Sequence, residues 1–229
     1  MTTSAVPPAG AIQAAIFDLD GTLIDSLADI ADAGNRMLAR RGHAPLPVER
    51  YPSFVGEGAR KLVEGLLADT GQPVTDEVIV AALREYRKEY EAGLIVQTRP
   101  YPQVLEVLAS LHQHGVRLAV LSNKPDEWTR MIVSELLSEI PFVEVRGQRQ
   151  GVPRKPDPTA ARELAAALAV PVDHIAFVGD TLVDMHTARA ANMHPVAVTW
   201  GFTDAQALAA AQPVHMVDSM SNLARWLMR

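Results

Sequence analysis

The apolar residues of the chain gather in short continuous runs, separated by segments in which apolar residues recur at helical spacing. Near-continuous apolar runs are typical of strands covered on both faces, as in a parallel sheet. Helical patterns lie between the runs, and one of them begins at Pro102 and ends at Gly115, residues that suit a first helical turn and a helix end. The alternation predicts an α/β fold with helices on both faces of a parallel sheet. The predicted strands cover residues 14–18, 117–123, 142–147, 174–180, 194–200 and, more weakly, 215–219.

Residues 26–94 interrupt this rhythm, because they hold helical patterns and no convincing strand. Three of these patterns end at glycines, and the last begins at Thr75, a good helix N-cap. We therefore expect an all-helical insert between the first and second strands of the sheet. The predicted organisation is a disordered leader at 1–11, an α/β core from 12–25 and 95–229, and a helical insert at 26–94.

Composition narrows the possible functions. The 229 residues carry a net charge of -6 and no cysteine, which excludes disulfides and thiol catalysis. No basic stretch is long enough to indicate a nucleic-acid surface, and no apolar run approaches the ~20 residues of a membrane helix. The first residues lack the basic and apolar regions of a secretion signal. We expect a soluble cytoplasmic protein, monomer or homodimer, with no nucleic-acid or membrane partner.

Polar residues follow the ends of the first four predicted strands. Because ligands bind outside the carboxyl ends of the strands in an open α/β sheet, these residues are expected to meet at one edge. Clustered carboxylates repel one another unless a cation lies among them, and oxygen ligands suit Mg²⁺. The residues are Asp18 and Asp20, Ser122 and Asn123, Lys155, and Asp180 and Asp184.

A lysine is unexpected in a site that binds only a metal cation, but it is expected if the site also binds an anion. Ser122, Lys155 and the backbone N–H groups of the Gly21–Thr22 turn would then hold a phosphate. Asp18 could attack a phosphoryl group, and Asp20 could serve as the acid and base. A strand-end turn for the two aspartates, a helix cap for Ser122 and a turn role for Asn123 are the structural alternatives.

Four motifs of the chain resemble those of the haloacid dehalogenase superfamily of phosphohydrolases, in the family's order: DLDGT (18–22), LSN (121–123), RKPDP (154–158) and GDTLVD (179–184). The resemblance implies a Rossmann-like core, a four-helix cap that closes over the site, and a Mg²⁺-dependent aspartyl-phosphate mechanism. It implies catalytic roles for Asp18 and Asp20. The implied phosphate-binding residues are Gly21, Thr22, Ser122, Asn123 and Lys155, and the implied metal ligands are Asp18, Asp20, Asp180 and Asp184.

Within this family the chain is similar to the phosphoglycolate phosphatases, over residues 54–67, 99–115 and 121–125. The similarity implies a small phosphorylated metabolite as partner, with 2-phosphoglycolate as the substrate. The chain departs from that subgroup at residues 148–150, because it has Gln-Arg-Gln where members of the subgroup often have acidic residues. The cap residues implied in specificity are Gly56, Glu57, Gly58 and Arg60, with a solvated surface as the alternative for Arg60 and Lys61.

Other functions stay open. A phosphatase of another small ester, such as a sugar phosphate or pyrophosphate, would use the same motifs, as would a β-phosphoglucomutase-like transferase. A non-catalytic binding module would be expected to lose a motif residue, and none is lost. Asp20 argues against a dehalogenase, which normally lacks this second aspartate. Neither cap lysine, Lys61 or Lys88, lies in a motif that matches a phosphonatase.

Overall fold

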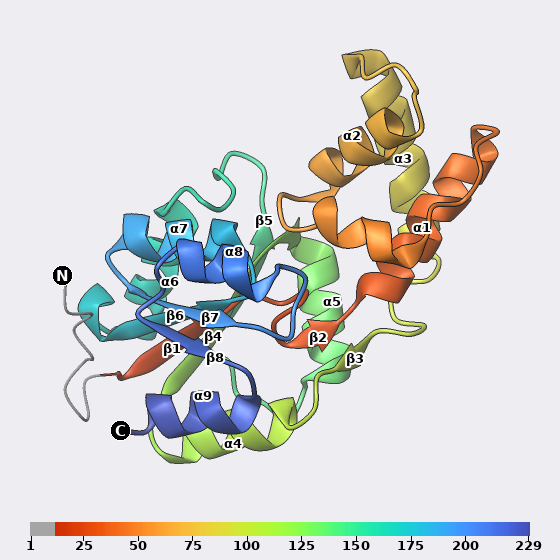
Figure 1. The fold of residues 1–229 in the computed structure, drawn as a ribbon. Helices are drawn as coiled ribbons and strands as arrows, with labels where there is room; N and C mark the ends of the chain where they lie inside the picture. The colour runs from red at the N-terminus through yellow and green to blue at the C-terminus, as the bar shows by residue number, and fades with distance from the viewer. Residues whose placement is uncertain (1–11) are drawn as a thin grey trace. The chain divides into compact units, whose positions relative to one another are not determined.

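The computed structural model describes residues 12–229, so the predicted leader at 1–11 lies outside the described residues. The chain forms two compact units, coloured along the sequence in Figure 1. The core unit consists of the described part of Met1–Ile24 together with Pro100–Arg229, and the helical unit is Asp25–Arg99. The chain therefore leaves the core once and returns to it once.

The core unit contains a six-stranded parallel sheet, which confirms the predicted α/β class. The strand order is β5-β4-β1-β6-β7-β8, so the first strand lies in the interior of the sheet, where Ile16 is in register with Ala119 on one side and Phe177 on the other. A separate two-stranded sheet pairs β2 (Ile24–Asp25) with β3 (Arg99–Pro100). The six strands are β1 (Ala14–Phe17), β4 (Arg117–Pro125), β5 (Glu144–Gln148), β6 (Ile175–Gly179), β7 (His194–Val198) and β8 (His215–Val217).

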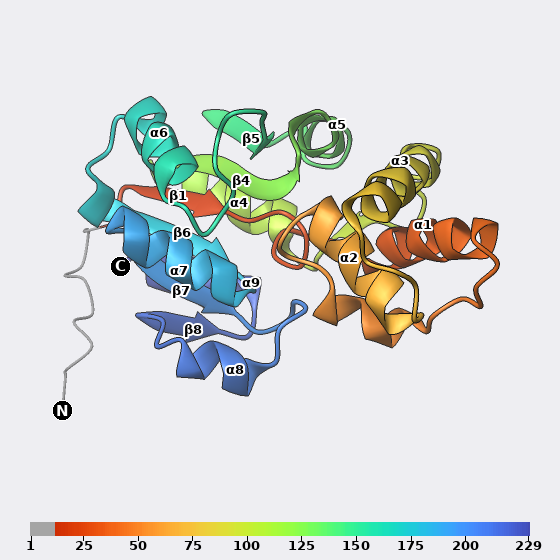
Figure 2. The same cartoon turned by 90° about the horizontal axis from the view of Figure 1, so that it is seen from above.

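Helices cover both faces of this sheet. In Figures 1 and 2, α6 (Thr159–Leu168) and α7 (Leu182–Ala191) lie over one face, while α4 (Val104–Gln113) and α9 (Met220–Leu227) lie over the other. Alternate residues of a strand point to opposite faces, so a strand buried on both sides must be apolar throughout. The fully buried Ala14–Phe17 run of β1 meets this requirement. The other core helices are α5 (Asp126–Leu136), α8 (Ala205–Ala210) and the short 3₁₀ helix η2 (Val172–His174).

The helical unit has its own apolar core. Its helices are α1 (Leu27–Arg40), η1 (Val48–Ser53), α2 (Ala59–Asp69) and α3 (Asp76–Glu91). The predicted all-helical insert is confirmed, with a 3₁₀ helix as its second segment. Pro52 lies inside this segment and has no N–H for a longer helical ladder. Within residues 12–229, no helix combines the length and apolarity needed to cross a lipid bilayer.

A buried aspartate fastens the end of the helical unit to its beginning. Asp29, in the first turn of α1, is 1% exposed. Its carboxylate accepts hydrogen bonds from the backbone N–H groups of Val96, Gln97 and Thr98 and from the Thr98 hydroxyl, at 2.6 to 3.0 Å. The charge therefore satisfies backbone donors of a segment that lies outside regular secondary structure.

We expect Asp29→Ala to lower the free energy of unfolding by about 2–3 kcal/mol, because the buried Thr98 and the backbone N–H groups of Val96 and Gln97 would lose a charged acceptor. Urea unfolding would measure this loss, and hydrogen exchange would localise it to Val96–Thr98. The exposed Asp32→Ala is the matched control on the same helix. Equal stability of the Asp29 and Asp32 variants would contradict the assignment.

Candidate active site

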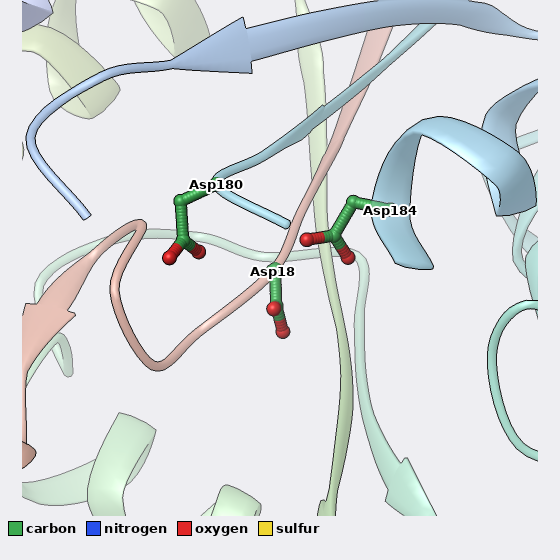
Figure 3. A group of neighbouring side chains, drawn as sticks. All are labelled: Asp18, Asp180 and Asp184. Atoms are coloured by element: carbon green, nitrogen blue, oxygen red, sulfur yellow. The ribbon is translucent and has the colours of Figure 1, made fainter. Parts of the chain in front are cut away.

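Three carboxylates meet at the carboxyl edge of the sheet. Asp18 follows β1, Asp180 follows β6, and Asp184 lies in the first turn of α7. The strands β1 and β6 are parallel neighbours, with Phe17 in register with Val178. Figure 3 shows the three side chains gathered around one space, and each offers an oxygen within 4.8 Å of the others. All three are buried. The fold therefore brings together three of the seven strand-end residues as a potential metal site.

Hydrogen bonds fix two of these carboxylates from outside the cluster. One oxygen of Asp180 accepts from the Thr22 hydroxyl and the other from the Phe202 N–H, both at 2.8 Å. Asp184 accepts from the hydroxyl and the N–H of Thr181 through the capping box that begins α7. The orientation of both carboxylates is thus set by the protein itself, as expected for groups that hold a ligand.

Two glycines allow the chain to pass close to Asp180. Gly21 has φ +79°, and a Cβ at this position would overlap the Asp180 carboxylate. A Cβ at Gly201 would overlap both Asp180 and the backbone carbonyl of Gly21. The loop after β7 therefore packs directly against the DLDGT turn. Sequence reasoning missed this loop, because a single Trp-Gly-Phe sequence carries no recognisable signal.

Lys155 supplies a positive charge to the cluster. Its Nζ lies 2.9 Å from Asp18 Oδ1 and 2.7 Å from Asp184 Oδ1, and its side chain is 2% exposed. Asn123 fixes the backbone of Lys155, because its amide oxygen accepts from the Lys155 N–H and its amide nitrogen donates to the Lys155 carbonyl. These contacts give Asn123 a positioning role, and phosphate contact by Asn123 stays a prediction.

The carboxylates of this cluster outnumber its one lysine, so negative charge is in excess there. Burial and the charge of Asp184 raise the pKa of Asp18 to about 7, although Lys155 acts in the opposite direction. Burial and the charges of Asp184 and Asp18 also hold the pKa of Asp180 well above its ordinary value. Burial lowers the pKa of Lys155, but the neighbouring aspartates outweigh it and raise this pKa overall. Crowded oxygen ligands with excess negative charge suit a hard divalent cation.

This imbalance predicts a pH-dependent stabilisation by Mg²⁺. Asp18 has a higher pKa in the folded chain, about 7, than the ordinary value of 3.8, so the metal-free protein should lose stability as the pH rises from about 4 to about 7. The loss from this one group is at most about 4 kcal/mol. Since Mg²⁺ compensates the ionised form, the melting temperature should rise more on Mg²⁺ addition at pH 8 than at pH 5. Thermal unfolding with Mg²⁺ and with EDTA at both pH values measures this difference. A Mg²⁺ effect that is equal at the two pH values would contradict a metal site on these carboxylates.

A second ion pair lies at the same edge, between Asp20 and Lys124. The Lys124 Nζ is 2.7 Å from Asp20 Oδ1, with side chains 6% and 11% exposed. The Lys124 backbone N–H donates to the Ser122 hydroxyl oxygen at 3.2 Å. Sequence reasoning assigned no role to Lys124. The signal was its i, i+2 spacing from Ser122, which places both on the same side of a regular strand.

Other predicted site residues have contacts of their own. The N–H groups of Gly21 and Thr22 donate to the carbonyls of Ile24 and Leu19 within the turn, and their contact with phosphate stays a prediction.

In the helical unit, Gly56 and Gly58 have positive φ angles before α2. Arg60 pairs with Glu64 and Asp76. The roles of Gly56, Glu57, Gly58 and Arg60 in specificity stay predictions.

Comparison with known proteins identifies this arrangement. A model of the haloacid dehalogenase-like hydrolases matches residues 12–192, which includes the DLDGT turn, Lys124, Lys155 and both aspartates of GDTLVD. The chain belongs to the haloacid dehalogenase-like hydrolases. It is an enzyme of the phosphatase type in this family, with a buried carboxylate cluster that fits a divalent metal.

Relatives within the family narrow the similarity further. The chain is 34% identical over 220 residues to a phosphoglycolate phosphatase of Neisseria meningitidis, covering 93% of this chain and 92% of that protein. It is 37% identical over 198 residues to one of Nitrosospira multiformis, covering 84% and 86%. The crystal structure of a predicted phosphoglycolate phosphatase from Haemophilus somnus matches with a TM-score of 0.85 and 26% identity, covering 94% of this chain and 97% of that one. The haloacid dehalogenase-like hydrolase described here is therefore similar to phosphoglycolate phosphatases over nearly its whole length.

Proposed function

We propose that this hydrolase removes phosphate from 2-phosphoglycolate, giving glycolate and phosphate, with Mg²⁺ as the metal. One observation carries the proposal. Asp18 lies within hydrogen-bond distance of the buried Lys155, and one of its oxygens lies within 4.8 Å of oxygens of Asp180 and Asp184, so the three could hold one metal ion. A carboxylate in these surroundings can face a phosphate group that is also bound by a cation and a lysine. The similarity to phosphoglycolate phosphatases supports the choice of substrate.

The proposed chemistry divides between two aspartates. An Asp18 oxygen attacks phosphorus, the bond from phosphorus to the leaving oxygen breaks, and Asp20 gives a proton to that oxygen. Asp20 then takes a proton from water, the water oxygen attacks phosphorus, and the bond to Asp18 breaks to release phosphate. Lys155 and the Ser122 hydroxyl would bind the phosphate oxygens and stabilise charge that develops on them.

The proposed metal ligands are Asp18, Asp180 and Asp184. When bound, Mg²⁺ would supply positive charge to the phosphate oxygens. Hydrogen bonds from Thr22, Phe202 and Thr181 fix the orientations of the Asp180 and Asp184 carboxylates. Their oxygens are therefore already oriented to bind a metal ion. Asp20 is bound to Lys124 in this structure, and this contact favours its acid–base role over direct metal binding.

A phosphate-release screen tests the proposal. The panel is 2-phosphoglycolate, hexose and pentose phosphates, glycerol phosphates, pyridoxal phosphate and pyrophosphate, each with Mg²⁺ and with EDTA. We expect Mg²⁺-dependent release that is fastest, by kcat/KM, with 2-phosphoglycolate. Faster release from another ester would keep the mechanism and overturn the substrate. Phosphoryl transfer without release would favour the mutase alternative.

A further inference from the structure

Lys124 lies beside Asp20, the proposed acid and base of the reaction. In the proposed function, which this inference extends, Asp20 protonates the oxygen that links phosphorus to the rest of the substrate. Whatever that oxygen carries must then lie next to Asp20. The Lys124 ammonium is 2.7 Å from Asp20 Oδ1, so it borders the same space.

Lys124 is held firmly in this place by its backbone. Its N–H donates to Ser122 Oγ, and its carbonyl accepts from the Thr129 hydroxyl at 3.3 Å. A Cβ on Gly147 would come within 2.5 Å of the Lys124 carbonyl oxygen, so β4 and β5 approach closely at this residue. The register of β4 against β5 is irregular between Leu121 and Pro125. The Lys124 side chain is itself only 6% exposed and paired with Asp20, so little of its freedom remains to be lost on binding.

The position of Lys124 differs from that of Lys155. Lys155 contacts Asp18 and Asp184, on the side where phosphorus is attacked. Lys124 contacts Asp20, on the side where the leaving oxygen is protonated. A phosphate needs the first lysine whatever ester it belongs to. The second lysine pairs with Asp20, and its ammonium also suits a leaving group that carries negative charge.

The distances are consistent with contact between Lys124 and a carboxylate two bonds beyond the leaving oxygen. If both use Asp20 Oδ1, two hydrogen bonds in series, from the leaving oxygen to Oδ1 and from Oδ1 to Nζ, span at most ~6 Å. A carboxylate oxygen on such a substrate lies ~3.5 Å from the leaving oxygen, from ordinary bond lengths. The remaining gap is about one hydrogen bond.

We propose that Lys124 is a specificity-determining residue that selects phosphate monoesters whose leaving alcohol bears a carboxylate close to the ester oxygen. The Lys124 ammonium pairs with that carboxylate while Asp20 serves the ester oxygen. Selection against esters whose leaving alcohol is uncharged thus lies partly in the core unit, at the same strand end as Ser122.

The test compares 2-phosphoglycolate with its neutral amide, 2-phosphoglycolamide, in four proteins. These are the wild type, Lys124→Met, Lys124→Arg and Lys88→Met, the last being an exposed lysine of α3 and the matched control. The measured quantity is the ratio of kcat/KM for the acid to that for the amide. We expect Lys124→Met to lower this ratio by about 10- to 100-fold, the usual effect of losing a charged hydrogen bond. Lys124→Arg should keep most of the preference, and Lys88→Met should equal the wild type.

The outcomes separate the two proposals. If the wild type prefers the acid and Lys124→Met loses rate equally on both substrates, Lys124 supports Asp20 or the fold only, and its role in specificity is overturned. If the wild type itself shows no preference for the acid, the phosphoglycolate proposal fails as well. Circular dichroism of each variant checks that it is folded, and the ratio cancels any shared loss of catalysis.

Discussion

Phosphate release is expected to fall by about ten-thousandfold or more when Asp18 is replaced by asparagine. The amide cannot form the proposed phosphorylated intermediate, and it removes one metal ligand. Asp18 follows the interior strand β1, and its carboxylate contacts Lys155. Single-turnover phosphate release with saturating Mg²⁺ measures the loss.

The same variant should remain folded. Burial and Asp184 raise the pKa of Asp18 to about 7, so the ionised carboxylate opposes folding above that pH in the absence of metal. At pH 8 in EDTA, Asp18→Asn should therefore unfold at a temperature equal to or higher than that of the wild type. The exposed Asp173→Asn, at the other end of β6, is the matched control and should keep full activity. Activity of the Asp18 variant within tenfold of the wild type would contradict its role as nucleophile.

Replacement of Lys155 by methionine is expected to reduce both catalysis and stability. The nearest carboxylates of Lys155, Asp18 and Asp184, would lie buried without the cation that pairs with them. Removing one partner of a buried ion pair costs about 3–5 kcal/mol. We expect a loss of this size in urea unfolding at pH 8 with EDTA, together with about a thousandfold lower kcat/KM with Mg²⁺.

The pH dependence of Lys155→Met distinguishes an ion pair from simple packing. Its loss of stability should shrink as the pH falls below about 7, the pKa of Asp18, because this carboxylate then binds a proton and no longer needs a cation. A loss of stability that is independent of pH would contradict the electrostatic account. Lys88→Met should match the wild type at every pH.

The meeting of the site residues at one edge of the sheet was predictable, because a parallel sheet brings the carboxyl ends of its strands together. Asp18 and Asp180 follow neighbouring strands, so two short motifs 162 residues apart were enough to expect their proximity. The six strands were predictable for a related reason, since burial on both faces demands apolar residues at nearly every position. The roles of these residues in the reaction rest on the proposed function.

Other features depend on tertiary structure that no local pattern encodes. Lys124 lies near the end of β4, which continues to Pro125, and it contacts Asp20, 104 residues earlier in the chain. The helix expected from Pro102 begins instead at Val104, because Gln103 has a left-handed φ of 65°. Asp29 looks like a solvated position of an amphipathic helix. Its backbone partners lie 67 to 69 residues away and emerge only from the fold.

The central claim is that Asp18 carries the phosphoryl group during turnover. Chemical trapping tests it most directly: the enzyme is mixed with Mg²⁺ and 2-phosphoglycolate, quenched in acid during steady state, and treated with borohydride, which reduces an aspartyl phosphate to homoserine. Peptide mass spectrometry then reads residue 18. The account predicts homoserine at position 18 in the complete mixture, and unmodified aspartate when substrate is omitted or EDTA replaces Mg²⁺. Sustained phosphate release with homoserine at another aspartate instead of Asp18 would contradict the account.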